Sequence, residues 1–249
     1  RESRLPALLA GELAGATGLS NAMKFLSGIE SLSIAATPAG AGWRLDGKLP
    51  WVTNLRRAGF AVAAAVEPSD GQPPAVVAFF GDTPGITRTV DLQLLALRGS
   101  NTAAIDIQGV ASGAAELIHA DARSFLPRVR PGFLGLQCGM SIGLARRALR
   151  ETERKLGSGR GVLGEPLENL TAALRGQVAL HAEGLRDNRF VEQAATLFEI
   201  RIALADITAE ALQLELQACG GAAYLSKPGR ETQRRTRAGC VTPRCDQSR

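Results

Sequence analysis

The hydrophobic residues of this chain repeat with two different periods, and the change between them falls close to residue 123. From about residue 32 to residue 122 the pattern is typical of β-strands. Three strand-like runs occur there, at 59–66, 75–80 and 102–110. In the last run Ile105 and Ile107 alternate with polar residues, as a strand with one buried face requires. Stretches rich in Gly, Pro and Asp at 69–74 and 81–85 predict the turns between strands.

From about residue 124 onward the apolar residues recur at spacings of three and four. The longest such stripe occupies most of residues 189–218 and consists of Leu197, Ile200, Leu204, Ile207, Ala211 and Leu214. A stripe of this length predicts a long amphipathic helix that packs in a bundle. Segments 131–157 and 166–187 are its predicted companions. We therefore predict an α+β protein, with an antiparallel β-barrel-like middle domain followed by a C-terminal helical bundle.

Composition and charge exclude several classes of function. The net charge of +5 arises in residues 224–249, which hold seven Lys or Arg against two acidic residues. No aromatic residues interleave with these basic ones, so we expect no nucleic-acid partner. The chain has no run of about 18 apolar residues and no apolar signal-peptide core at its start, so we expect neither a membrane span nor secretion, but a cytoplasmic protein. Four scattered cysteines predict neither a disulfide framework nor a metal site.

Residues 42–54 carry the most informative motif, in which Gly-Trp-Arg-Leu-Asp-Gly is followed by Trp-Val-Thr-Asn at 51–54. Trp51 and Thr53 are two residues apart, so a strand would present both on one face. A flat apolar side chain beside a hydroxyl suits a flavin ring, which needs cover on one face and polar groups at its N5 and O4 edge. From these residues alone, an ordinary hairpin with a buried Trp is an equally good interpretation.

Three further runs follow in the chain: 97–102 (Leu-Arg-Gly-Ser-Asn-Thr), 160–167 (Arg-Gly-Val-Leu-Gly-Glu-Pro-Leu) and 217–224 (Gln-Ala-Cys-Gly-Gly-Ala-Ala-Tyr). The paired glycines Gly220 and Gly221 would let the backbone approach a phosphate closely. The guanidinium of Arg160 suits bidentate phosphate binding. Taken singly, the Gly pair is also typical of a helix C-cap, and Arg160 of a solvated loop.

Together and in this order, the four runs resemble the acyl-CoA dehydrogenase superfamily. The resemblance implies FAD as the cofactor, with Trp51 and Thr53 at the flavin ring. It also implies that a bundle from a neighbouring subunit holds the pyrophosphate and adenine end, through Arg160, Gln217, Gly220 and Gly221. A homodimer or homotetramer is the expected assembly. The domains would be 1–29, a remnant of the family's N-terminal helical domain, then 30–123, the β middle domain, and 124–249, the bundle with a basic tail.

Two positions depart from the family pattern. Residues 1–29 read as short helical pieces, and Ser20 is the candidate remnant of the family's Thr-Glu-Pro…Gly-Ser-Asp segment. The catalytic residue is unassigned. A gap-free count beyond Gly220 reaches Arg244, which cannot act as a base because its pKa lies above about 12. A second family position, here the Phe-Leu-Gly at 133–135, also lacks a carboxylate, which leaves Glu215 and Glu231 as substitutes.

Three functions are consistent with these motifs. The first is an FAD-dependent oxidoreductase that acts on the CH–CH group of an acyl-CoA and passes electrons to an acceptor protein. The second is a flavin-dependent monooxygenase of the same fold, supplied by a flavin reductase. The third is a catalytically degenerate homologue. Because no catalytic Glu is found, we expect weak or absent acyl-CoA dehydrogenase activity from the chain as given. For His119 and His181, packing or surface roles are the favoured interpretation.

Overall fold

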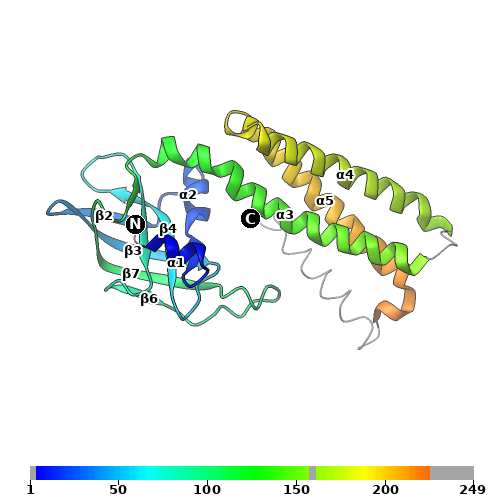
Figure 1. Cartoon of the computed structure of the whole chain (residues 1–249), viewed down its shortest axis with the longest axis horizontal. Coiled ribbons are helices and arrows are strands. Elements are labelled where there is room, and N and C mark those ends of the chain that lie inside the picture. Colours follow the sequence, from blue (N-terminus) through cyan, green and yellow to red (C-terminus); the bar gives the residue numbers. More distant parts are fainter. Residues whose placement is uncertain (1–3, 157–160, 225–249) are drawn as a thin grey trace. The chain divides into compact units, whose positions relative to one another are not determined.

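The computed structural model describes residues 4–156 and 161–224 and divides into two compact units (Figure 1). The β unit comprises Arg1–Arg128 and the helical unit comprises Val129–Arg249. All described strands lie in the β unit, and the helical unit contains the bundle. This confirms the predicted α+β fold, in which a curled sheet precedes a C-terminal helical bundle.

The sheet has eight strands in the order β6-β7-β3-β2-β4-β5-β8, with β1 paired to β4 outside this path. The strands are β1 (Ala14–Thr17), β2 (Ile34–Ala39), β3 (Gly42–Val52), β4 (Phe60–Pro68), β5 (Ala75–Phe80), β6 (Ile86–Arg88), β7 (Ala103–Ser112) and β8 (Leu117–His119). Pairing is antiparallel except where β1 and β2 meet β4. The predicted strand runs and the turns between them are confirmed.

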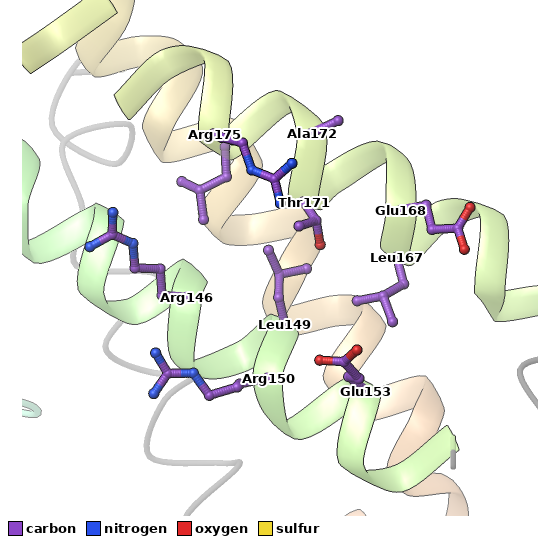
Figure 2. Close-up of a pocket in the computed structure, with 10 residues that line it drawn as sticks. Arg146, Leu149, Arg150, Glu153, Leu167, Glu168, Thr171, Ala172 and Arg175 are labelled. Carbon is purple, nitrogen blue, oxygen red and sulfur yellow. The ribbon is translucent and has the colours of Figure 1, made fainter. Parts of the chain in front are cut away.

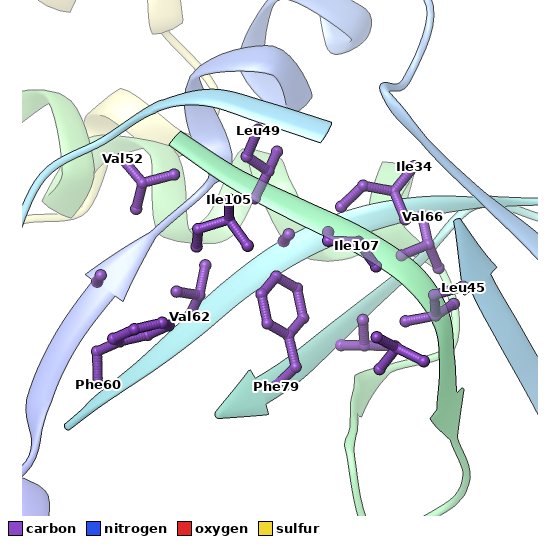
Figure 3. Close-up of a cluster of buried hydrophobic side chains, with 14 of the residues drawn as sticks. Ile34, Leu45, Leu49, Val52, Phe60, Val62, Val66, Phe79, Ile105 and Ile107 are labelled. Atoms are coloured by element: carbon purple, nitrogen blue, oxygen red, sulfur yellow. The ribbon is translucent and has the colours of Figure 1, made fainter. Parts of the chain in front are cut away.

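One apolar cluster fills the interior of the curled sheet (Figure 3). Ile105 and Ile107 of β7 contribute to it with exposed fractions of 0% and 1%, which confirms their predicted alternation. Opposing strands supply its other large members, including Ile34, Leu45, Val62, Val66 and Phe79. Each such side chain stabilises the fold by roughly 1.5–3 kcal/mol when it is buried.

The N-terminal segment belongs to this β unit and is only partly helical. Its helices are α1 (Leu5–Leu9) and α2 (Leu19–Leu26), as the sequence predicts. The helical interpretation is wrong for β1, which runs parallel to β4. Composition favoured a helix, but Ala14 and Ala16 are buried on alternate positions while their neighbours are exposed. Arg56 secures the preceding turn by donating to the carbonyl oxygens of Gly11 at 2.6 Å and Glu12 at 3.1 Å.

The helical unit is built from α4 (Gly164–Arg186), α5 (Ala194–Cys219) and most of α3 (Ala122–Leu156), whose residues up to Arg128 belong to the β unit. The single-turn 3₁₀ helices η2 (Gly161–Leu163), η3 (Arg189–Val191) and η4 (Gly220–Tyr224) lie between or after them. The predicted apolar stripe of α5 is buried throughout, in Leu197, Ile200, Leu204, Ile207, Ala211 and Leu214. Its helix begins later than the stripe suggested, because residues 189–191 form η3 and the backbone of Gln193 (φ -99°, ψ 59°) is not helical.

Helix α3 begins earlier than predicted, at Ala122 instead of residue 131. Asp121 caps the N-terminus of this helix, because its Oδ1 accepts the N–H of Arg123 at 2.9 Å. His119 supports this turn: its Nδ1 accepts the N–H of Asp121 at 3.1 Å, and its ring stacks on Phe125. These contacts give His119 a structural role. The helix continues through Pro127 and Pro131, although each lacks the N–H that a helix interior uses.

His181 of α4 is buried in the helical unit with an exposed fraction of 9%. Its Nε2 has no hydrogen-bond partner among the described residues. The atom lies near Gly135 of α3, where a side chain would meet it at 3.3 Å. Burial lowers the pKa of His181 below its usual range, and the backbone of Gly135 offsets part of that effect. We infer a neutral imidazole that packs between α3 and α4.

The helical unit should therefore lose stability as the pH falls below about 6.5, the ordinary histidine value. The unfolded chain binds a proton there before the folded chain does, because the folded pKa of His181 is the lower one. The expected loss grows until the pH passes the folded pKa. Urea unfolding followed by helical circular dichroism between pH 7.5 and pH 5 measures it. In His181→Leu this part of the pH dependence should disappear, and an unchanged slope would contradict the assignment.

Candidate functional site

The end of β3 presents an aromatic side chain to the outside of the β unit. Trp51 is 63% exposed, whereas the next residue, Val52, is fully buried. The alternation of the strand explains the difference, since Val52 occupies the core-facing position. The alternative interpretation of a buried Trp at this position is therefore wrong. An exposed indole of this size is available to cover a planar ligand.

A cavity of about 400 Å³, here called the strand-end cavity, adjoins Trp51. Its walls come from the first turns of α2, the segment 30–33 and the end of β3: Gly18, Ser20, Asn21, Lys24, Glu30, Ser31, Ser33, Leu49, Pro50 and Trp51. The structure thus brings the candidate Ser20 to the same cavity as Trp51, although the two are 31 positions apart in the chain.

Asn21 gives this cavity its shape, and sequence reasoning did not identify it. Its Nδ2 donates to Glu30 Oε1 and to the carbonyl oxygen of Ser31, both at 2.9 Å. Its Oδ1 accepts the N–H of Ser33 at 2.9 Å. Lys24 forms an ion pair of 3.5 Å with the other oxygen of Glu30. These contacts fasten the segment 30–33 to α2, so the polar wall is held in place by the protein itself.

Thr53 follows the strand and is joined to the 97–102 run by hydroxyl groups. Its Oγ1 lies 3.1 Å from Thr102 Oγ1, and Thr102 Oγ1 lies 2.7 Å from Ser100 Oγ. The backbone reinforces this contact, since the N–H of Asn54 donates to the carbonyl oxygen of Ser100 at 2.9 Å. The two motifs, about fifty residues apart in sequence, therefore form one site.

Asn54 and Arg88 hold this corner of the β unit together. Asn54 adopts a left-handed backbone (φ 68°), which Asn tolerates better than most residues. Its Nδ2 donates to the carbonyl oxygen of Gly15 in β1 at 2.9 Å. Arg88 Nε donates to the carbonyl oxygen of Leu55 at 2.7 Å. Asn54 could have been anticipated as the last residue of the 51–54 motif, whereas nothing in the sequence marks Arg88.

Arg88 is also the source of a local electrostatic effect. It forms an ion pair and a hydrogen bond with Asp91, three residues further along the chain. The hydrogen bond from Arg88 lowers the pKa of Asp91 below its usual range. Asp91 therefore stays negatively charged. It keeps the guanidinium of Arg88 directed at the backbone carbonyl oxygens of Leu55 and Thr89.

The remaining predicted site residues lie in or beyond the helical unit. Gln217 is exposed in the last turn of α5, and its carbonyl oxygen accepts the N–H of Gly220. Gly220 therefore does end the helix, as the alternative reading of the glycine pair predicted. Apart from their neighbours along the chain, no atom of the described residues lies within 4 Å of the position where a side chain of Gly220 or Gly221 would begin. The backbone there is open to close approach. Arg160 lies outside the described residues.

The candidates for a catalytic base find no support here. Glu215 is fully buried in α5, with an exposed fraction of 0%. Arg244 and Glu231 lie outside the described residues. The other family position, Gly135, faces the buried His181. The catalytic residue stays unassigned.

The helical unit has a groove of its own, between α3 and α4 (Figure 2). It has a volume of about 500 Å³. It is lined by charged residues of both helices (Arg146, Arg150 and Glu153 of α3, Glu168 and Arg175 of α4) and by the apolar residues Leu149, Leu167 and Leu174. Both signs of charge line this groove, and they do not by themselves select a ligand.

The described parts of the chain contain neither a cluster of metal-ligating side chains nor a membrane-spanning helix. Within residues 4–156 and 161–224, no three His, Cys, Asp or Glu side chains gather as a metal site would require. No helix in these same ranges is long and apolar enough to cross a membrane.

Comparison with known proteins gives a consistent result. No family model matches the chain. It is 24% identical over 253 residues to the probable acyl-CoA dehydrogenase YngJ of Bacillus subtilis (strain 168), a match that covers 93% of this chain and 64% of YngJ. The fold is similar to that of a glutaryl-coenzyme A dehydrogenase in its glutaryl-CoA complex, with a TM-score of 0.80 and 14% identity over 96% of this chain and 63% of the other.

The fold is also similar to that of PigA with FAD and proline, with a TM-score of 0.75 and 16% identity. That match covers 95% of this chain and 64% of PigA. The chain thus spans a little less than two thirds of the length of these relatives. At these identities the structural matches establish the fold.

Proposed function

Because this chain is similar in sequence and in fold to acyl-CoA dehydrogenases, we propose that it belongs to their superfamily, binds FAD and oxidises the CH–CH group of an acyl-CoA thioester. The observation that carries the proposal is the arrangement at the end of β3. There an exposed Trp51 and the candidate Ser20 line one polar cavity, and the exposed Thr53 follows two residues after Trp51. This is the set of groups that a flavin ring requires: an aromatic cover and a hydroxyl for its polar edge.

In this proposal, the residues of the β unit orient the flavin ring. Trp51 would cover one face, and it excludes water from that face by its bulk. Thr53 would hydrogen-bond the N5 and O4 edge. When bound, the flavin would supply the acceptor for the hydride taken from the substrate. The α-proton must leave to a base, and that residue is not assigned.

The helical unit would hold the other end of the cofactor. Gly220 and Gly221 expose backbone without a side chain in the way, and Gln217 lies within one turn of them. Arg160 is the proposed pyrophosphate partner from outside the described residues. Following the family resemblance, these groups would bind the FAD of a second copy of the chain, in a homodimer or homotetramer. An electron-acceptor protein would then reoxidise the flavin.

The second candidate function is a flavin-dependent monooxygenase. This candidate is compatible with the likeness to PigA with FAD and proline, in which the same fold occurs with a ligand other than a CoA thioester. It needs no carboxylate base, and none was found at the family positions. A degenerate homologue would keep the fold without turnover.

One set of spectra separates the three functions. Purified protein is titrated with FAD, and bound flavin is followed by its visible absorbance. Acyl-CoA thioesters are then added without oxygen. A dehydrogenase bleaches its flavin under these conditions, whereas a monooxygenase responds only to reduced flavin and oxygen. No flavin binding at all would refute both enzymatic proposals.

Replacement of Thr53 by Val should weaken FAD binding about fivefold. The change removes one hydroxyl, and a hydrogen bond contributes about 1 kcal/mol net. The strand propensity is retained, because both residues are β-branched. Thr87→Val is the matched control, since Thr87 is an exposed threonine of β6. Equal affinities of wild type and Thr53→Val in an FAD titration would remove Thr53 from the proposed site.

A further inference from the structure

The three hydroxyls of Ser100, Thr102 and Thr53 form a continuous chain that ends at the proposed flavin edge. The distances are 2.7 Å from Ser100 Oγ to Thr102 Oγ1 and 3.1 Å from Thr102 Oγ1 to Thr53 Oγ1. Thr102 in the middle is 6% exposed, whereas Thr53 at the end is exposed. One end of the chain is therefore accessible to a ligand, and its centre is shielded from water.

The fold fixes the positions of these three hydroxyl groups from both strands. Val52 pairs with Ala103 between β3 and β7, which places Thr53 beside Thr102. The N–H of Leu55 donates to the carbonyl oxygen of Asn101 at 3.0 Å, and the N–H of Leu92 donates to that of Thr102 at 2.9 Å. The backbones on both sides are thus held, so the hydroxyl spacing does not depend on a flexible loop.

Each hydroxyl has one proton to donate and lone pairs to accept with. Thr102 has two hydroxyl neighbours, so it donates to one and accepts from the other. If Ser100 donates to Thr102 and Thr102 donates to Thr53, the proton of Thr53 is free for an outside acceptor. If the order is reversed, Thr53 donates inward and offers its lone pairs to an outside donor. Both orders use the same heavy-atom positions.

Oxidised flavin presents acceptors along its N5 and O4 edge, and reduced flavin carries an N–H at N5. We propose that Thr102, completed by Ser100, is a positioning residue that lets Thr53 bond this edge in both oxidation states by reversing the direction of the hydroxyl chain. The proposal rests on the proposed function, because Thr53 must face the flavin. It deepens that function by assigning roles to Thr102 and Ser100 within the same site.

The test is a double-mutant cycle between Thr102 and Thr53 with FAD as the probe. Thr102→Val keeps the shape and removes the hydroxyl, whereas Thr102→Ser keeps the hydroxyl and removes a methyl group. The FAD dissociation constant, the visible spectrum and the two-electron midpoint potential are measured for the wild type, both Thr102 variants, Thr53→Val and the Thr53→Val/Thr102→Val double variant.

We expect Thr102→Val to weaken FAD binding roughly 2- to 5-fold, which is at most the loss expected for Thr53→Val. Thr102→Ser should stay close to the wild type. The double variant should bind no more weakly than Thr53→Val, because Thr102 acts through Thr53. The potential of Thr102→Val should move by less than about 9 mV, a twofold change in the ratio of the two affinities, because binding of both oxidation states is weakened alike.

Three results would overturn the proposal while leaving the proposed function standing. These are wild-type affinity in Thr102→Val, a Thr102→Ser variant as weak as Thr102→Val, and additive losses in the double variant. A shift of about 20 mV or more in the midpoint potential of Thr102→Val would show that the hydroxyl groups stabilise one oxidation state of the flavin only. This result would overturn the proposed reversal of their hydrogen bonds. A wild-type protein that binds no FAD would refute the proposed function and this inference together.

Discussion

The Gly47→Ala variant is expected to lose about 3 kcal/mol of stability in the β unit. Gly47 lies in β3 opposite Ile34 of β2, at a point where the pairing of β3 with β7 shifts register. A side chain there would overlap the carbonyl oxygen of Ser33 and lie 2.9 Å from the Cα of Ile34. Both are backbone atoms of a paired segment, and Ile34 is fully buried, so neither can move aside cheaply.

Tryptophan fluorescence in a urea titration measures this loss, because both tryptophans, Trp43 and Trp51, lie in the β unit. The matched control is Gly15→Ala in β1, where a side chain would make an ordinary contact of 3.6 Å with Leu8. The control should unfold close to the wild-type midpoint. FAD binding should fall with the stability of Gly47→Ala, since β3 carries Trp51. A Gly47→Ala variant with the urea midpoint of the wild type would show that the backbone of β2 can shift to accommodate the side chain.

The parts of the fold that the sequence predicted correctly are those governed by local periodicity. The alternation around Ile105 and the stripe from Leu197 to Leu214 each follow from which side of one element faces the core. The predicted run 75–80 coincides with β5 because turn residues bound it on both sides. Strand β1 was missed, since four residues rich in Ala and Gly carry almost no periodic signal.

The candidate site was predictable as a set of motifs but not as a geometry. The 51–54 and 97–102 runs were both noticed, and their contact depends on the register of β3 with β7, which no local pattern reveals. For the same reason the buried hydroxyl of Thr102 and the clamp made by Asn21 were not identified. The exposure of Trp51 follows from the core position of Val52, a choice that the sequence left open.

The roles predicted for Gln217, Gly220 and Gly221 are still predictions. The glycine pair ends α5 and keeps its backbone open, and these two properties are compatible. A glycine segment that ends a helix and leaves its backbone uncovered can also offer N–H donors to a phosphate. FAD titration of variants at these positions separates the two interpretations.

Two glycines of α4 should respond to alanine in opposite ways. Gly184→Ala is expected to destabilise the helical unit by about 2 kcal/mol, because a side chain there would overlap the ring of Phe190. Phe190 is 1% exposed within the apolar cluster of the bundle, so its ring cannot swing out of the way. The gain in helix propensity, about 1 kcal/mol, offsets only part of the overlap.

Gly176→Ala is the matched control in the same helix, because no atom of the described residues outside the helix's own backbone lies within 4 Å of the Cβ it would add. It should stabilise the helical unit by about 0.5–1 kcal/mol, so the two variants should differ by about 3 kcal/mol. Urea unfolding followed by circular dichroism at the helical band measures both, while tryptophan fluorescence reports the β unit separately. Adding Phe190→Leu to Gly184→Ala should cost less than the two changes do singly, since the smaller side chain relieves the overlap. Equal stability of Gly184→Ala and Gly176→Ala would mean that Phe190 does not pack against α4 as described.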